Sequence, residues 1–194
     1  MKLLRCAAVL LLVLGVVAVN AQTVDLGEGA YSNSKAPITL VVDTALVSLK
    51  IDSPYVMFMA WMGATHDDHQ IGVTPKYVVM IYNGQEYPLA TVKELRDNYN
   101  GMKDDIDIYR RLDKGAVVSS KVRLFRYVKE GDFFPVLGLR ATTPVEEASL
   151  YNDIGFRTKL YFKNPGFKHG DKATIRVWDK KDPAVSAEVE VTIK

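Results

Sequence analysis

The chain has 194 residues, of which 48% are hydrophobic and 25% charged, and its formal net charge is +2. Because basic and acidic residues nearly balance, the composition gives no electrostatic support for binding nucleic acid. Cys6 is the only cysteine, which excludes a disulfide framework within the chain.

The N-terminal segment has the three-part pattern of a cleavable signal peptide. Lys2 and Arg5 introduce an apolar stretch over residues 6–19, and small residues precede a cleavage site at Ala21-Gln22. We therefore predict that residues 1–21 are removed and that the protein is secreted or periplasmic. The apolar stretch is shorter than the roughly 20 residues that span a bilayer, and no later segment approaches that length.

Cleavage at this point would remove Cys6 together with Lys2 and Arg5. The mature chain would then hold 23 basic and 23 acidic residues and no thiol. Its length is sufficient for a hydrophobic core without covalent cross-links.

Most of the mature chain has the apolar period of β-strands. Residues 22–36 are rich in Gly, Ser, Asn and Asp, and we predict a flexible leader there. From residue 37 onwards, apolar residues recur at every second position in short runs that turn residues separate. The run from Val185 to Ile193 alternates most clearly. The same alternation recurs over residues 46–51, 156–163 and 173–178.

Two further runs, Tyr55–Met62 and Tyr77–Tyr82, are apolar at successive positions. Strands of this kind are covered on both faces, so we expect another layer to lie over them. Asn83 and Gly84 directly follow the second run and predict a tight hairpin turn.

Residues 91–112 interrupt the β pattern. Thr91 and Glu94 fit a capping box, and the apolar residues as far as Tyr99 fall on one helical face. Residues 105–109 fit the edge of a strand as well as a helix. We predict an inserted, partly helical connection, with a helix that lies on the sheet.

Together these elements predict a mainly β fold. The expected architecture is an antiparallel two-sheet β-sandwich, Ig-like or jelly-roll-like, with a short, partly helical insertion around residues 91–112. A single domain over residues 37–194 is expected, because no Pro/Ser-rich linker divides the chain. Two small sandwiches that meet near residues 114–115 are the alternative.

One cluster of metal-ligand residue types lies at residues 57–69. Its members are Met57, Met59, His66, Asp67, Asp68 and His69. Thioether sulfur suits Cu(I) and imidazole suits Cu(II) or zinc, so a copper or zinc site is one interpretation. In the other, the methionines fill core space and the His-Asp run forms a polar loop. We prefer the second interpretation and expect no cofactor, with copper or zinc as the alternative.

Two aromatic residues, Tyr161 and Trp178, occupy the polar side of otherwise alternating strands. Exposed aromatic side chains on a sheet can anchor a protein partner or stack against a sugar. Because Lys and Arg flank both residues, cation–π packing across strands is the structural alternative. We take Tyr161 and Trp178 as candidate partner-binding residues.

Signatures of catalysis are absent from the sequence. It contains no Gly-x-Ser-x-Gly elbow, no phosphate-binding glycine loop and no His-Glu-x-x-His helix. The sequence therefore favours an exported, non-catalytic protein that binds a protein, a glycan or another cell-envelope partner. A periplasmic copper- or zinc-binding protein is the alternative function.

Overall fold

The structure is a computed structural model, and it describes residues 22–33, 36–65, 70–112, 126–127, 132–135 and 144–194. Strands predominate, so the prediction of a mainly β fold is confirmed. The strands are β1 (Thr23–Gly27), β2 (Ala30–Asn33), β3 (Ile38–Asp43), β4 (Tyr55–Ala64), β5 (Ile71–Val73), β6 (Val78–Tyr82), β7 (Gln85–Pro88), β8 (Arg126–Tyr127), β9 (Ala148–Leu150), β10 (Ile154–Lys163), β11 (Lys172–Trp178) and β12 (Ser186–Thr192). The helices are α1 (Ala45–Leu49), α2 (Val92–Asn98), α3 (Met102–Arg111) and the short 3-10 helix η1 (Pro75–Tyr77).

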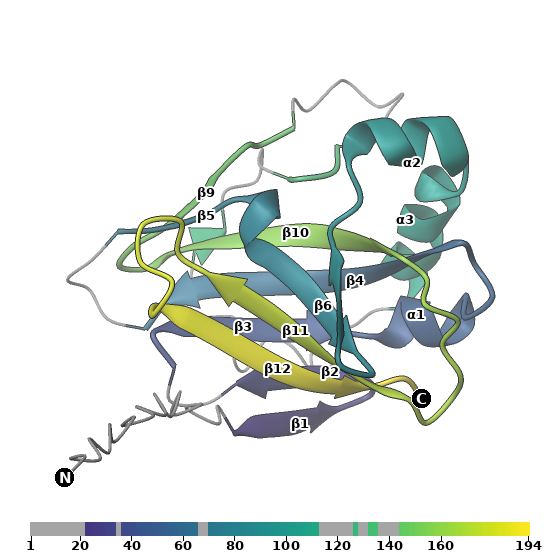
Figure 1. Ribbon diagram of the computed structural model, residues 1–194, viewed down its shortest axis with the longest axis horizontal. Coiled ribbons are helices and arrows are strands. Elements are labelled where there is room, and N and C mark those ends of the chain that lie inside the picture. The colour runs from purple at the N-terminus through teal and green to yellow at the C-terminus, as the bar shows by residue number, and fades with distance from the viewer. Residues whose placement is uncertain (1–21, 34–35, 66–69, 113–125, 128–131, 136–143) are drawn as a thin grey trace, which may run out of the picture.

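The described strands form two larger sheets and one small one. The six-stranded sheet has the order β1-β2-β3-β4-β10-β8, the four-stranded sheet β12-β11-β6-β7, and β5 pairs with β9. Figure 1 shows the two larger sheets as layers, and β12 contacts β2 and β3 of the other sheet. Pairing is antiparallel as predicted, except that β8 runs parallel to β10. At one edge, a bridge between Leu89 and Phe162 links the end of β7 to β10.

The C-terminal hairpin follows the register that its alternation predicts. Ala187, Val189 and Val191 of β12 are buried, and their register partners on β11 are Val177, Ile175 and Ala173. A slip of one residue would bury glutamates, so burial fixes the register. The predicted hairpin between β6 and β7 is also confirmed: Asn83 and Gly84 have φ of 51° and 76°, as its tight turn requires.

The predicted cover is present over the first doubly apolar run, which forms β4, but it is wrong for the second run, because Ile81 and Tyr82 of β6 are only half-buried. Every residue of β4 is buried, and α1 packs against it. Thr91 accepts a hydrogen bond from the backbone N–H of Glu94, and the Glu94 carboxylate accepts one from the N–H of Thr91, so the capping box of α2 is confirmed. Residues 105–109 belong to α3 and not to a strand edge.

The predicted flexible leader is wrong for most of its length. Within residues 22–36, the chain forms β1 and β2, which pair as a hairpin on the six-stranded sheet. Gly27, Glu28 and Gly29 make the turn with positive φ. All four residues of β2 are buried, so this strand has no alternating pattern that could identify it.

The alternation over residues 46–51 does not mark a strand either. This segment contains α1, in which Leu46 and Val47 are buried while Leu49 is 61% exposed. The Asp43 carboxylate accepts a hydrogen bond from the N–H of Ala45, 2.7 Å away, which satisfies a free donor at the helix start. A helix of five residues is too short to show a helical period in the sequence.

Candidate functional site

The described residues contain only part of the predicted metal cluster. Residues 66–69 lie outside them, so the structure places Met57 and Met59 alone. Both methionines are buried in β4, in register with Tyr161 and Lys159 of β10. Met57 stands about 23 Å from Ala64, the end of β4, at the usual rise of a strand. The metal site stays a prediction; within the described residues, no three His, Cys, Asp or Glu side chains are grouped to hold a metal ion.

Tyr161 is not a surface residue, and the expectation that it is exposed is wrong. Its exposed fraction is 0%. The ring packs edge-on against Phe134 with centroids 5.3 Å apart, and against Tyr99 at 6.2 Å. The sheet face that carries Tyr161 is therefore covered. We call it the covered face and define it by Asp43, Met57, Met59, Lys159 and Tyr161, which share one side of β3, β4 and β10.

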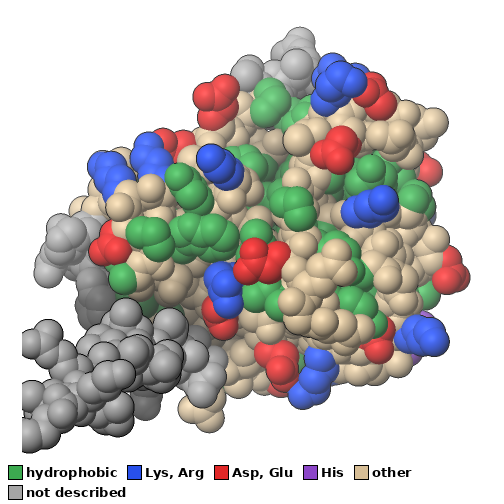
Figure 2. Space-filling view, viewed as in Figure 1, with side chains coloured by type: hydrophobic (Ala, Val, Ile, Leu, Met, Phe, Trp, Pro, Cys, Tyr) green, Lys and Arg blue, Asp and Glu red, His purple; other side chains and the backbone are tan. Residues whose placement is uncertain are grey.

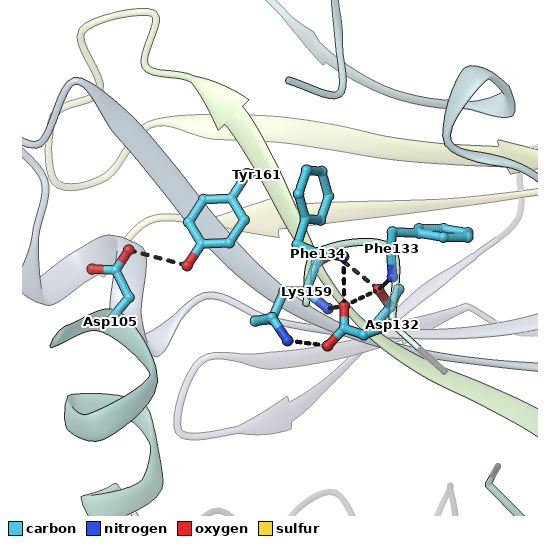
Figure 3. Close-up of polar contacts among 7 residues, drawn as sticks. Asp105, Asp132, Phe133, Phe134, Lys159 and Tyr161 are labelled. Atoms are coloured by element: carbon cyan, nitrogen blue, oxygen red, sulfur yellow. Dashed lines mark hydrogen bonds and ion pairs between the residues drawn. The ribbon is translucent and has the colours of Figure 1, made fainter. Parts of the chain in front are cut away.

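Asp105 of α3 is the centre of a hydrogen-bond network on the covered face. The residue is 1% exposed, and its carboxylate accepts hydrogen bonds from Tyr99 at 2.7 Å and from Tyr161 at 3.2 Å. Lys50 pairs with the same carboxylate. Figure 3 shows the Tyr161 hydroxyl directed towards Asp105 of the helix. The network thus joins α3 to β10 through buried polar atoms.

The environment of this network favours neutral phenols and a charged lysine. Burial raises the pKa of Tyr161, and the charge of Asp105 raises it further. Burial likewise raises the pKa of Tyr99. For Lys50, burial opposes the charge, but hydrogen bonds to Asp105 and Tyr99 outweigh it and raise its pKa. The phenols therefore remain hydrogen-bond donors to Asp105 at neutral pH.

One turn further along α3, Tyr109 makes a second contact with the covered face. Its hydroxyl donates to the Asp43 carboxylate of β3 at 2.9 Å. Burial raises the pKa of Tyr109, and the negative charge of Asp43 adds to the effect. Because Asp105 meets β10 and Tyr109 meets β3, α3 crosses the sheet and fixes both strands.

Residues 132–135 pack on the covered face along the edge of β10. Asp132 forms an ion pair with Lys159, whose residue exposure is 6%. The other Asp132 oxygen accepts hydrogen bonds from the Thr158 hydroxyl at 2.8 Å and the N–H of Phe134 at 3.0 Å. Figure 3 shows these contacts, with Lys159 and Asp132 directed towards one another.

Trp178 lies on the opposite side of the molecule. It is half-buried at the end of β11, and its ring packs against Tyr77 with centroids 5.8 Å apart and planes tilted by 59°. We call the outward side of the four-stranded sheet the open face. Its residues are Tyr77, Val79, Ile81, Glu86, Pro88, Lys172, Thr174, Arg176, Trp178, Ser186, Glu188 and Glu190.

The charged side chains of the open face form ion pairs that are exposed to solvent. Arg176 pairs with Glu188 of β12, with Nε and Oε1 2.5 Å apart, and with Glu86 of β7 at 3.4 Å. Lys172 pairs with Glu190 at 2.8 Å. All of these side chains are more than a third exposed. Figure 2 shows this side of the molecule, where basic and acidic side chains lie next to one another with hydrophobic side chains among them.

The two faces therefore offer different chemistry. Asp105 and Asp132 on the covered face each accept hydrogen bonds from several donors, which leaves their carboxylates engaged in structural contacts. The open face presents a partly exposed aromatic pair beside a guanidinium group. Such a surface can make contacts with a second molecule, whereas the covered face holds its polar groups inside the fold.

The sequence pattern missed the buried polar residues for an identifiable reason. Lys159 and Tyr161 alternate with apolar residues, which reads as a solvent-facing side. A usable signal lay in α3, where Met102, Asp105 and Tyr109 fall on one helical face. A carboxylate on the apolar side of a helix indicates a buried, partnered charge.

Comparison with family models, with curated proteins and with solved structures finds no match. Among the described residues, no helix is long and apolar enough to cross a membrane.

Proposed function

We propose that the protein is an exported, non-catalytic β-sandwich protein that binds a protein partner of the cell envelope through the open face. Export is supported by the charged start, the apolar stretch and the cleavage site within residues 1–21. A non-catalytic role is supported by the hydrogen bonds that the protein's own donors make to the carboxylates of buried Asp105 and half-buried Asp132.

One observation carries the binding role: Trp178 is packed against Tyr77 but remains partly exposed beside Arg176. Trp, Tyr and Arg are the residue types that contribute most often to binding energy at protein interfaces. Apolar side chains of Ile81 and Pro88 extend the same surface. Contact with a partner would remove this apolar area from water.

The ring geometry favours a protein partner over a stacked sugar. The planes of Trp178 and Tyr77 are tilted by 59°, so the pair does not present one flat aromatic platform. A protein side chain can fill the angle between two tilted rings, and the rim of paired charges can then exclude water around it.

The test is to capture partners from an envelope extract with the immobilised mature protein. We expect Trp178→Ala to weaken capture of the partner by at least about tenfold, as for a central interface residue. Tyr151→Ala is the matched control, because Tyr151 is 39% exposed but directly follows β9, where it bridges to Ile154 outside the open face. Unfolding curves of all variants check that the fold is retained.

Intrinsic fluorescence gives an independent readout. The chain has two tryptophans, so Trp61→Phe leaves Trp178 as the sole indole. We expect the emission of Trp178 to shift when the captured partner is added. Equal capture by the parent and Trp178→Ala, or an unchanged emission, would overturn the proposal. Binding to a glycan array that depends on Trp178 would replace the protein partner with a glycan.

A further inference from the structure

We propose that Lys159 and Asp132 are joined by an isopeptide bond, formed in the folded chain between Nζ of the lysine and Cγ of the aspartate with loss of water. The bond would be a covalent modification of the fold, independent of the proposed partner. Four observations carry it: the pairing of the two groups, the low exposure of their side chains, the hydrogen bonds around the carboxylate and the aromatic contacts that hold the Asp132 segment against β10.

The fold brings the two reacting groups together from adjacent segments. Lys159 belongs to β10, and β8, shortly before Asp132 in the chain, runs parallel to the same strand. The two side chains form an ion pair and are 8% and 21% exposed. Holding two reactants in contact converts a bimolecular reaction into an intramolecular one, with a large gain in effective concentration.

The two oxygens of Asp132 stand in different environments. Oδ1 accepts hydrogen bonds from the Thr158 hydroxyl at 2.8 Å, the N–H of Phe134 at 3.0 Å and the N–H of Lys159 at 3.4 Å. Oδ2 faces Nζ of Lys159. Donors gathered on one oxygen stabilise the negative charge that it gains when a nucleophile attacks the carbon, as an oxyanion hole does.

Two aromatic contacts fix the segment that carries Asp132 against β10. Phe133 packs against Phe156 with centroids 4.9 Å apart, and Phe134 packs against Tyr161 at 5.3 Å. The reaction begins when the Lys159 ammonium passes a proton to the Asp132 carboxylate, because the neutral amine is the nucleophile.

The reaction balances without a further reagent. Nζ forms a bond to Cγ, and the bond between Cγ and Oδ2 breaks. Oδ2 leaves as water with two of the three ammonium hydrogens, and the third remains as the amide N–H. Charge is conserved because an ion pair becomes a neutral amide, and no oxidant or reductant takes part.

The pair between Lys50 and Asp105 provides an internal comparison. Both oxygens of Asp105 accept hydrogen bonds from Tyr99, at 2.9 and 2.7 Å, and the Lys50 side chain is 27% exposed. Neither oxygen of Asp105 is held by backbone N–H groups in the described contacts. We expect this pair to remain an ion pair.

The experiment is the intact mass of the denatured, exported protein. We expect a mass lower than that of the mature sequence by about 18 Da, one molecule of water. After trypsin digestion, we expect a branched peptide in which residues 130–140 are joined to residues 158–163, because acylated Lys159 is no longer cleaved.

Three variants locate the bond. Lys159→Arg keeps the positive charge but cannot form the amide, so its full mass is expected, as is that of Asp132→Ala. Lys50→Arg is the matched control and should retain the deficit. A full mass for the parent protein overturns the proposal. So does a deficit confined to an unbranched peptide 130–140, which would be a cyclic imide at Asp132.

Discussion

The covered face and the open face both carry ionised side chains, but they hold them in different ways. On the covered face, Asp105 is 1% exposed and its partners include two phenols of the protein. On the open face, Arg176 and its glutamate partners are more than a third exposed. Solvent therefore screens the second set of charges and is largely excluded from the first.

This contrast identifies the contacts on which the stability of the fold depends. A buried carboxylate that loses its partners has no water to replace them, so each contact on the covered face affects the stability of the fold. An exposed ion pair exchanges one set of hydrogen bonds for another with water. The open face can therefore change its partners at low cost, as a binding surface requires.

The largest expected effect is that of Asp105→Asn. The substitution removes the charge that balances Lys50 and disturbs the bonds from Tyr99 and Tyr161. We expect a loss of about 3 kcal/mol in the free energy of unfolding, the low end of the range for a broken buried pair, because Lys50 is partly exposed. Urea unfolding curves measure it.

Asp97→Asn is the control for this substitution. Asp97 pairs with Lys93 on the exposed side of α2, and its side chain is 48% exposed. A change within about 0.5 kcal/mol is expected. A similar loss in both variants would show that burial does not distinguish the two kinds of ion pair.

The second-largest effect is a loss of folding stability at alkaline pH, caused by the buried tyrosines of the covered face. Burial raises the pKa values of Tyr109 and Tyr161 above the ordinary value of 10.0. Above pH 10 the unfolded chain releases protons that the folded chain retains, so stability is complete below that pH and falls as the pH rises. The loss approaches about 1.4 kcal/mol per pH unit for each phenol.

Unfolding free energies between about pH 9 and about pH 11 measure this slope. Tyr109→Phe and Tyr161→Phe should each reduce it by one phenol's contribution, although each costs some stability at neutral pH. A slope that no variant changes would mean that other groups cause the alkaline loss.

Much of the fold could be predicted because apolar and polar residues alternate along its strands or because turn residues follow them. The register of β12, the Asn83-Gly84 turn and the Thr91 capping box all follow from local patterns. β1 and β2 could not be predicted in this way. The turn glycines were visible, but β2 is buried throughout and owes its place to pairing with β3.

The candidate site was less predictable than the fold. Tyr161 and Trp178 have the same sequence signature, an aromatic residue on the polar side of a strand, yet Tyr161 is buried and Trp178 is partly exposed. What separates them is the cover by α3 and residues 132–135, which are distant in the sequence. A local pattern does not specify which face such segments will cover.

The smallest effect is expected for the ion pair between Arg176 and Glu188 on the open face. Arg176→Gln and Glu188→Gln should each change the free energy of unfolding by less than about 1 kcal/mol. The coupling energy between them, from the double-mutant cycle, should be about 0.2–1 kcal/mol and should decline as salt is added, because the pair is exposed. The cycle of Lys50 with Asp105 should be larger and depend less on salt. If salt instead weakened both couplings equally, solvent exposure would not be the property that distinguishes the two faces. The open face would then exchange its contacts for those of a partner no more easily than the covered face.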